Sequence, residues 1–173
     1  MAAVMLAGAA CGSSGSTVGS SATSTSRTAA PTTTAAVTSA TVDLARSPQY
    51  GVILADASGR TLYMLTADTP TSSACATACI AHWPPVTATG GPTAGTGVTA
   101  ALLGTITRSD GAHQVTYAGH QLYTFARDTA AGQVNGQRIT AFGGTWYVLG
   151  ATGQPVTTAP PAGTTTTTVA LGY

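Results

Sequence analysis

The sequence predicts an all-β protein: a small antiparallel, barrel-like domain built from two divergent repeats, with a short helical turn near residues 73–82 and disordered termini. Three observations carry this prediction. Short runs of β-branched and aromatic residues alternate with turns that contain Asp and Gly. Helical periodicity is nearly absent. One ten-residue pattern occurs twice, sixty residues apart.

The composition excludes several classes of partner. Only 6% of the 173 residues are charged, and the formal net charge is +1. All six basic residues are Arg and all five acidic residues are Asp. Such a chain offers no basic patch for nucleic acid or for an anionic membrane surface. We therefore expect no nucleic-acid partner.

The N-terminal corner resembles the end of a bacterial lipoprotein export signal. Residues 1–10 are apolar and small, and Cys11 follows them directly, ahead of a Gly/Ser run. The resemblance implies that Cys11 becomes a lipid-modified N-terminus, which would anchor the protein to the extracytoplasmic face of the cell membrane. Gly8 stands where Leu usually lies, and no basic residue precedes the apolar run. We therefore expect the true start to lie upstream of the printed one.

Low-complexity segments flank the folded part. Residues 12–47 are assigned to a disordered tether of Ser, Thr and Ala, because such a composition buries too little apolar surface to offset its ordering entropy. Residues 158–173 form a low-complexity tail with five consecutive threonines. The β-rich domain is thus expected at residues 48–157, with repeat copies at about residues 50–86 and 104–150.

The first predicted element is a hairpin. Residues 51–55 and 60–65 are strand-like and flank a turn at residues 56–59. In that turn Asp can cap the backbone and Gly can supply a positive φ.

A three-stranded meander is predicted next. Residues 104–108 and 113–117 flank a second turn at residues 109–111, and residues 121–125 add a third strand. A further strand, rich in aromatic and β-branched residues, is predicted at residues 145–149.

The repeated pattern reads G-x-x-L-Y-x-(Leu or Phe)-x-x-D. It occupies residues 59–68 and 119–128, and each copy continues to a tryptophan, Trp83 or Trp146. Matching of five residue types in register is improbable by chance, so we interpret the copies as one duplicated supersecondary unit. The motif residues are Tyr63 and Asp68 in the first copy and Tyr123, Phe125 and Asp128 in the second.

With this motif the chain resembles a family of bacterial secreted lipoproteins, abundant in actinobacteria, built from a repeat of unknown function with a Y-x-(aromatic)-x-x-D signature. The resemblance covers about residues 50–150. The second copy matches the signature fully, whereas Leu65 replaces the aromatic residue in the first. The resemblance implies an envelope location and a small β-rich repeat domain, and it implies no specific activity.

Two interpretations of the motif remain. Residues two apart in a strand share a face, so Tyr123 and Phe125 are expected to pack together, as are Tyr63 and Leu65. Each Asp would then accept a backbone N–H two residues on and close an Asx-type turn. The alternative is a pair of Tyr/Asp ligand sites. We favour the structural interpretation, because a repeated scaffold requires the same residues twice.

The cysteines indicate an oxidising compartment. With Cys11 assigned to lipid, Cys75 and Cys79 remain, and two nearby cysteines outside the cytoplasm most often form a disulfide. The alternative is a metal site of Cys75, Cys79 and His82, which would suit copper or zinc. Trp83 is expected to fill the core beside this loop, because the prolines that follow it favour an extended connection.

The sequence favours a non-enzymatic protein. It offers no carboxylate pair, nucleophile elbow or phosphate loop. The predicted function is that of a cell-envelope lipoprotein acting as a binding or structural module for an unknown envelope ligand or protein. The alternative is an envelope redox or metal/heme-handling protein that uses Cys75, Cys79 and the histidines, with copper or heme as its cofactor.

Overall fold

A computed structural model describes residues 39–158 and confirms the all-β prediction. Within these residues the strands are β1 (Thr41–Ser47), β2 (Gly51–Asp56), β3 (Tyr63–Leu65), β4 (Thr93–Ala94), β5 (Leu103–Thr107), β6 (His113–Tyr117), β7 (His120–Gln121), β8 (Thr140–Ala141) and β9 (Gly144–Val148). The helices are α1 (Ala78–His82) and the 3-10 helix η1 (Ala100–Leu102). Helix α1 lies inside the predicted helical turn. Cys11, most of the predicted tether and nearly all of the predicted tail lie outside the described residues.

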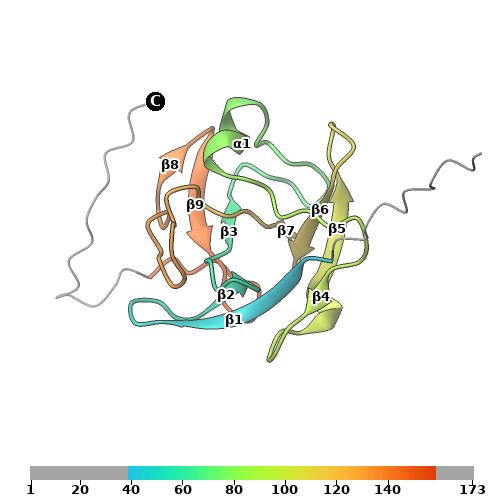
Figure 1. The fold of residues 1–173 in the computed structure, drawn as a ribbon. Coiled ribbons are helices and arrows are strands. Elements are labelled where there is room, and N and C mark those ends of the chain that lie inside the picture. The colour runs from blue at the N-terminus through green and yellow to red at the C-terminus, as the bar shows by residue number, and fades with distance from the viewer. Residues whose placement is uncertain (1–38, 159–173) are drawn as a thin grey trace, which may run out of the picture. The chain divides into compact units, whose positions relative to one another are not determined.

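The strands form three small sheets, in the orders β2-β1-β4, β3-β9-β8 and β5-β6-β7 (Figure 1). Every strand pairing is antiparallel except that of β1 with β4. The sheets surround a common interior, with β3 near its centre (Figure 1).

Strand β1 corrects the predicted domain boundary. The sequence prediction places residues 41–47 in the tether, but they pair with β2 over six residue pairs. The average composition of residues 12–47 conceals this strand, because a strand in which apolar and polar residues alternate needs only a few apolar residues. Val42 is fully buried and Leu44 is partly buried against the same core cluster. The folded domain therefore begins about seven residues earlier than predicted, by Thr41.

The first predicted hairpin forms its turn but only a short ladder. Gly59 has a φ of 77°, and its N–H donates to the carbonyl of Asp56 at 2.8 Å. Oδ1 of Asp56 accepts the N–H groups of Ser58 and Arg60 at 2.8 and 3.0 Å. Beyond this turn the chain leaves β2, and β3 pairs with β9 instead. Strand β9, which belongs to the second repeat copy, thus takes the place beside β3 that the hairpin prediction gives to β2.

The second half follows the prediction closely. Strands β5, β6 and β7 form the expected meander, although β7 is shorter than predicted. Strand β9 lies at the predicted position, shifted by one residue.

The two repeat copies meet at Tyr63 and Tyr123. The N–H of Tyr63 donates to the carbonyl of Tyr123 at 2.9 Å, and the N–H of Tyr123 donates to the carbonyl of Tyr63 at 3.0 Å. These residues occupy the same position in the two copies. The reciprocal bonds therefore relate the copies by an approximate two-fold axis.

Each copy also contributes its Trp-containing segment to the other copy. In β9 of the second copy, Val148 lies opposite Tyr63. In the first copy, Pro85 lies opposite Tyr123, and the N–H of Val86 donates to the carbonyl of Leu122 at 2.9 Å. The predicted extended connection after Trp83 is thus a strand-like segment that completes the other repeat's sheet.

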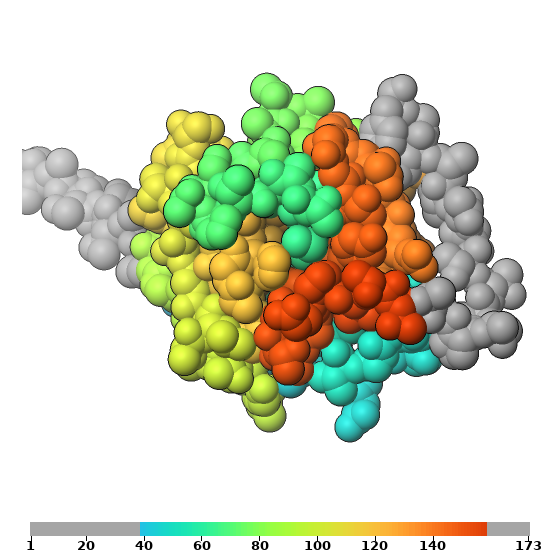
Figure 2. Space-filling view, turned by 180° about the vertical axis from the view of Figure 1, so that it is seen from behind, coloured from blue at the N-terminus to red at the C-terminus, as the bar shows by residue number. Residues whose placement is uncertain are grey.

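Two clusters make up the core. One combines aromatic side chains with the cysteines: Ile53, Tyr63, Leu65, Cys75, Cys79, Trp83, Tyr123, Phe125, Trp146 and Val148. The other is mostly aliphatic: Val42, Leu54, Leu62, Met64, Ala88, Val115, Tyr117, Leu122 and Leu149. Both clusters draw on both copies. Figure 2 shows the same interleaving at the surface, where the green residues after β3 lie beside the orange residues around β9.

Candidate functional site

The motif tyrosines and aspartates form two crossed pairs. The phenol of Tyr63 donates to Oδ2 of Asp128 at 2.6 Å. The phenol of Tyr123 donates to Oδ2 of Asp68 at 2.7 Å. In both pairs the tyrosine and the aspartate come from different copies. The sequence places these residues in one motif, but it does not predict that the motif closes across the repeat boundary.

Each aspartate also closes a loop within its own copy. Oδ1 of Asp68 accepts the N–H of Ala74 at 2.7 Å, and Oδ1 of Asp128 accepts the N–H of Asn135 at 3.0 Å. The expected Asx-type turn, with an N–H two residues on, is therefore wrong. The N–H that each aspartate accepts lies six or seven residues further along the chain. The longer loop lets the carboxylate reach the tyrosine of the other copy.

Burial has the largest effect on the pKa values of these tyrosines and aspartates. It raises the pKa of Asp68 and of Asp128, although hydrogen bonds to both carboxylates oppose the change. Burial and the facing carboxylate raise the pKa of Tyr63 well above the usual phenol value. Burial also raises the pKa of Tyr123, with a smaller contribution from Asp68. At neutral pH the tyrosines are therefore uncharged hydrogen-bond donors.

Aromatic rings fill the space between the two pairs. The indoles of Trp83 and Trp146 stack with centroids 3.8 Å apart and planes 1° apart. Phe125 stacks on Trp83 at 4.3 Å. Tyr63 meets Trp83 edge-on at 5.4 Å, and Tyr123 meets Trp146 edge-on at 5.1 Å. The predicted core roles of Trp83, Tyr123 and Phe125 are confirmed by their burial.

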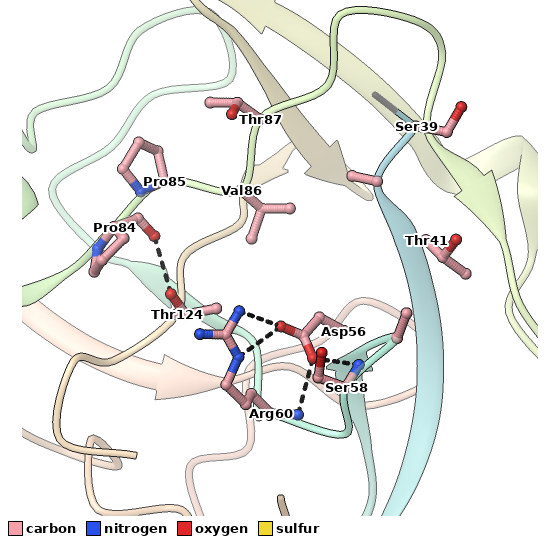
Figure 3. A pocket seen from close by; sticks show the side chains of 12 residues that line it. Ser39, Thr41, Asp56, Ser58, Arg60, Pro84, Pro85, Val86, Thr87 and Thr124 are labelled. Atoms are coloured by element: carbon pink, nitrogen blue, oxygen red, sulfur yellow. Dashed lines mark hydrogen bonds and ion pairs between the residues drawn. The ribbon is translucent and has the colours of Figure 1, made fainter. Parts of the chain in front are cut away.

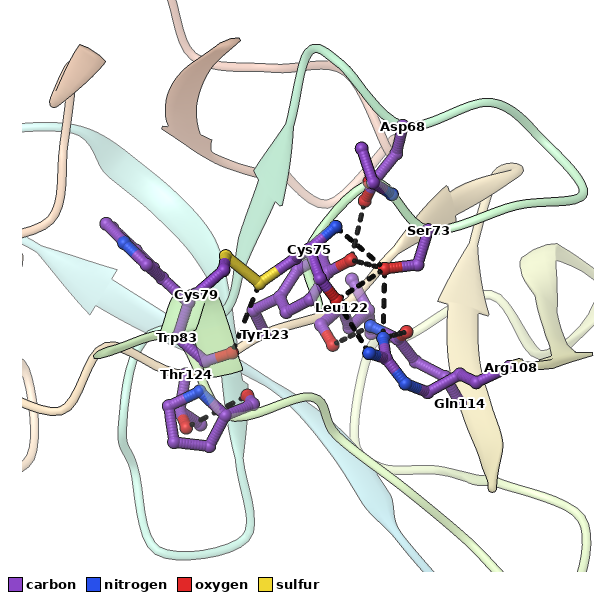
Figure 4. Close-up of a disulfide and its surroundings, with 12 residues drawn as sticks. Asp68, Ser73, Cys75, Cys79, Trp83, Arg108, Gln114, Leu122, Tyr123 and Thr124 are labelled. Carbon is purple, nitrogen blue, oxygen red and sulfur yellow. Dashed lines mark hydrogen bonds between the residues drawn. A yellow bond between two sulfur atoms is a disulfide. The ribbon is translucent and has the colours of Figure 1, made fainter. Parts of the chain in front are cut away.

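The predicted disulfide joins Cys75 and Cys79 (Figure 4). Both sulfur atoms are therefore bonded to each other and are not available as metal ligands. His82, the third member of the alternative metal site, has its ring 6.0 Å from that of Phe142. Residues 39–158 contain no group of three or more His, Cys, Asp or Glu side chains that could hold a metal ion. The Cys75, Cys79 and His82 metal site is thus overturned.

A buried arginine supports the disulfide loop (Figure 4). Nη2 of Arg108 donates to the carbonyl of Cys75 at 2.6 Å. Its Nη1 donates to Oγ of Ser73 at 2.9 Å and to Oε1 of Gln114 at 2.6 Å. Ser73 in turn lies 2.7 Å from the phenol of Tyr123. Sequence reasoning missed this network, since no spacing links an arginine in the second copy to a loop of the first.

An open groove lies apart from these buried groups (Figure 3). Its volume is about 500 Å³, and we call it the Asp56–Arg60 groove. Its lining residues are Ser39, Ala40, Thr41, Asp56, Ala57, Ser58, Arg60, Pro84, Pro85, Val86, Thr87 and Thr124. Nη2 of Arg60 lies 2.7 Å from Oδ2 of Asp56, and the arginine side chain is 47% exposed. The sequence prediction places Asp56 in a turn and Arg60 at the start of the strand that follows it, and it assigns neither residue to a site.

A family model described as a secreted repeat of unknown function matches residues 45–87 and 104–150. The chain belongs to this family. The two matches coincide with the predicted repeat copies and with the two halves that interlock in the fold. Comparison with curated proteins and with solved structures gave no match.

Membership of the secreted repeat family fits an extracytoplasmic location. No helix within residues 39–158 is long and apolar enough to cross a membrane. In this member of the secreted repeat family, the motif tyrosines and Asp128 are buried and Asp68 is half-buried, and each tyrosine is hydrogen-bonded to the aspartate of the other copy. The Asp56–Arg60 groove, by contrast, is open and combines charged and apolar groups.

Proposed function

We propose that this protein is a non-enzymatic binding module, held by a lipid on Cys11 at the extracytoplasmic face of the cell membrane, that binds a saccharide in the Asp56–Arg60 groove. The observation that carries the proposal is the Asp56–Arg60 ion pair on the open wall of that groove (Figure 3). The carboxylate of Asp56 fixes the guanidinium of Arg60 through Nε and Nη2, and the remaining N–H groups of the exposed arginine are charge-assisted donors for saccharide hydroxyls.

The rest of the groove suits the same ligand class. Hydroxyl groups of Ser58, Thr87 and Thr124 lie around it, whereas Pro84 and Val86 supply apolar surface. A sugar ring presents hydroxyls at its edge and C–H groups on its faces, so it can use both kinds of surface. Small-molecule sites commonly combine apolar walls with a few polar groups that fix orientation.

The hydrogen bonding of the motif aspartates and tyrosines within residues 39–158 fits a binding role. The carboxylates of Asp68 and Asp128 each accept two hydrogen bonds from protein groups, and the phenols opposite them donate to these carboxylates. These groups stabilise the scaffold and do not face the Asp56–Arg60 groove.

Chemical-shift mapping with oligosaccharides tests the binding site. Protein labelled with ¹⁵N is titrated with soluble oligomers of hexose, pentose and N-acetylhexosamine. We expect shifts at Ser58, Arg60 and Val86 with at least one oligomer, and their loss in Arg60→Gln. The matched control is Arg127→Gln, because Arg127 is an exposed arginine outside the groove. Shifts that persist in Arg60→Gln, or none with any oligomer, would contradict the proposal.

Mass spectrometry of protein isolated from the cell envelope tests the anchor. We expect Cys11 to be amino-terminal and lipidated, and Cys11→Ala to release the protein from the membrane fraction. An unmodified Cys11 in membrane-bound protein would contradict the anchor and leave the saccharide test unaffected.

A further inference from the structure

The aromatic core brings rings from both repeat copies into direct contact. Four rings form a continuous row, Tyr63, Trp83, Trp146 and Tyr123, which we call the aromatic array. We propose that the aromatic array is a one-electron relay, which takes oxidising equivalents from peroxide-derived radicals outside the cytoplasm and passes them to a small thiol or ascorbate-type reductant. This role goes beyond saccharide binding and uses no residue of the Asp56–Arg60 groove.

The spacing of the rings suits electron transfer between them. Successive centroids lie 5.4, 3.8 and 5.1 Å apart along the row. The two central indoles are parallel to within 1° and their centroids are 3.8 Å apart, so their π systems are in stacking contact. An electron vacancy on either indole can therefore be shared with its neighbour and can reach either phenol without crossing an aliphatic gap.

The two ends of the array carry proton acceptors. A phenol that loses an electron becomes strongly acidic, so a stable tyrosyl radical forms only where a base takes the proton. Asp128 lies 2.6 Å from the phenol of Tyr63, and Asp68 lies 2.7 Å from that of Tyr123. Both carboxylates already accept the hydrogen bond along which the proton would move. Proton transfer thus needs no rearrangement.

Unlike the phenols, the two indoles have no proton acceptor among residues 39–158, which suits them to carry the electron vacancy only transiently. Both are fully buried, and within the described residues neither indole N–H has a hydrogen-bond partner. An oxidised indole loses its N–H proton only to an acceptor. Without one, the indole cation keeps its proton, and the vacancy passes on reversibly. A buried N–H without a partner costs free energy in a purely structural core, which makes its presence at both equivalent positions notable.

Connections to the surface exist at both ends. Tyr50 is half-buried, packs against the aromatic cluster, and lies close enough to Tyr63 to raise the pKa of that phenol. Asp68 lines a second hollow of about 290 Å³, together with His120. Tyr50 can therefore pass an electron outward to an oxidant, and the hollow gives the proton on Asp68 a route to solvent.

The step balances in electrons and protons. A hydroxyl radical takes one electron from the array and becomes hydroxide. The vacancy settles on Tyr63 or Tyr123, and the phenolic proton moves to Oδ2 of Asp128 or Asp68, which yields a neutral tyrosyl radical and a carboxylic acid. Ascorbate then donates one electron, and the proton returns to the phenol. Ascorbate becomes the ascorbyl radical and releases its own proton to solvent.

Flash oxidation with photogenerated tris(bipyridine)ruthenium(III), followed by freeze-quench electron paramagnetic resonance, tests the relay in the full chain. We expect a neutral tyrosyl radical in the wild type and its loss in Tyr63→Phe/Tyr123→Phe. The matched control is Tyr117→Phe. Tyr117 is equally buried, but its phenol donates to the carbonyl of Ala151, which is a poor proton acceptor. The control should keep the wild-type signal.

Two further variants separate a relay from ordinary packing. Asp68→Asn/Asp128→Asn retains the rings but removes the proton acceptors, so the signal should be lost although the amide ¹⁵N spectrum still shows a folded domain. Trp146→Phe should reduce the yield of the radical. A wild-type radical yield in the double tyrosine variant or in the double asparagine variant would overturn the relay and leave the saccharide test unaffected.

Discussion

The phenol of Tyr63 donates a 2.6 Å hydrogen bond to Asp128, a residue of the other repeat copy. Tyr123 and Asp68 make the equivalent bond in the opposite direction along the chain. Each copy therefore supplies the carboxylate that accepts the hydrogen bond of the other copy's buried phenol. The signature residues hold two copies together, which favours the structural interpretation of the motif over a pair of ligand sites.

The crossed pairing predicts which mutations are coupled. A double-mutant cycle of Tyr63→Phe with Asp128→Asn should show a coupling free energy of about 1–3 kcal/mol, because one mutation removes the donor and the other removes the charged acceptor of the same hydrogen bond. The control cycle pairs Tyr63→Phe with Asp68→Asn, which share no hydrogen bond, and should be additive within about 0.5 kcal/mol. Free energies of unfolding in urea give both values. Equal coupling in the two cycles would contradict the crossed arrangement.

The raised pKa of Asp128 predicts an unusual pH dependence. Because burial raises this pKa above the usual 3.8, the folded state binds the proton more tightly than the unfolded state. The resulting stabilisation is complete below the unfolded pKa and is lost as the pH rises through the folded pKa. Acidification from pH 7 should therefore stabilise the wild type relative to Asp128→Asn.

Urea midpoints of the two proteins at several pH values between neutrality and about pH 4 measure this difference. The comparison isolates Asp128, since His120 and the exposed Asp110 are present in both proteins. A wild type that loses stability relative to Asp128→Asn on acidification would show that the pKa of Asp128 is lowered.

Gly136 lies where the array leaves no space. A Cβ at this position would come within 2.7 Å of Cη2 of Trp83 and 2.9 Å of Cζ of Tyr63. Gly136→Ala should therefore destabilise the domain by about 1–3 kcal/mol, the usual cost of overpacking. Gly91→Ala is the matched control, because a Cβ there meets nothing within 4 Å. Thermal unfolding of both variants decides the matter, and equal midpoints would contradict the tight packing.

The disulfide closes a short loop. Cys75 and Cys79 are four residues apart, so the bond removes little entropy from the unfolded chain, and Cys75→Ala/Cys79→Ala should lose about 2 kcal/mol. Arg108 also holds the carbonyl of Cys75, so the rest of the domain should stay folded. Hydrogen exchange should increase mainly in α1 and its flanking loop. Unfolding of the entire domain would show that the bond holds the whole fold.

Strand β1 predicts the trypsin cleavage pattern. The predicted tether contains Arg27 and Arg46, and a tether that extended to residue 47 would be cut at both. In the structure Arg46 pairs with Val52 in the ladder between β1 and β2, which should protect its peptide bond. We expect brief digestion to cut after Arg27 and to spare Arg46. Early cleavage after Arg46 would contradict the β1 pairing.

Much of the fold could be predicted because its signals are local. The turns at Gly59 and Gly111 need a positive φ, and alternating β-branched and aromatic residues identify the strands around them. The disulfide could also be predicted, since Cys75 and Cys79 are neighbours in the chain. Strand β1 was missed because its few apolar residues follow a long Ser/Thr segment. The link from Arg108 to the disulfide loop was missed because Ser73 and Cys75 lie 35 and 33 residues away in the chain.

The sequence by itself determined that the chain is an all-β duplication, since residue types and periodicity record local conformation and ancestry. It also determined which residues carry the signature. Only the tertiary structure decided that Tyr63 bonds Asp128 and that Trp83 stacks on Trp146. A motif within one copy is the same string whether its side chains pair within that copy or across to the other. The choice depends on how each Trp-containing segment returns through the core, and that path is set by burial and strand pairing between residues distant in the chain.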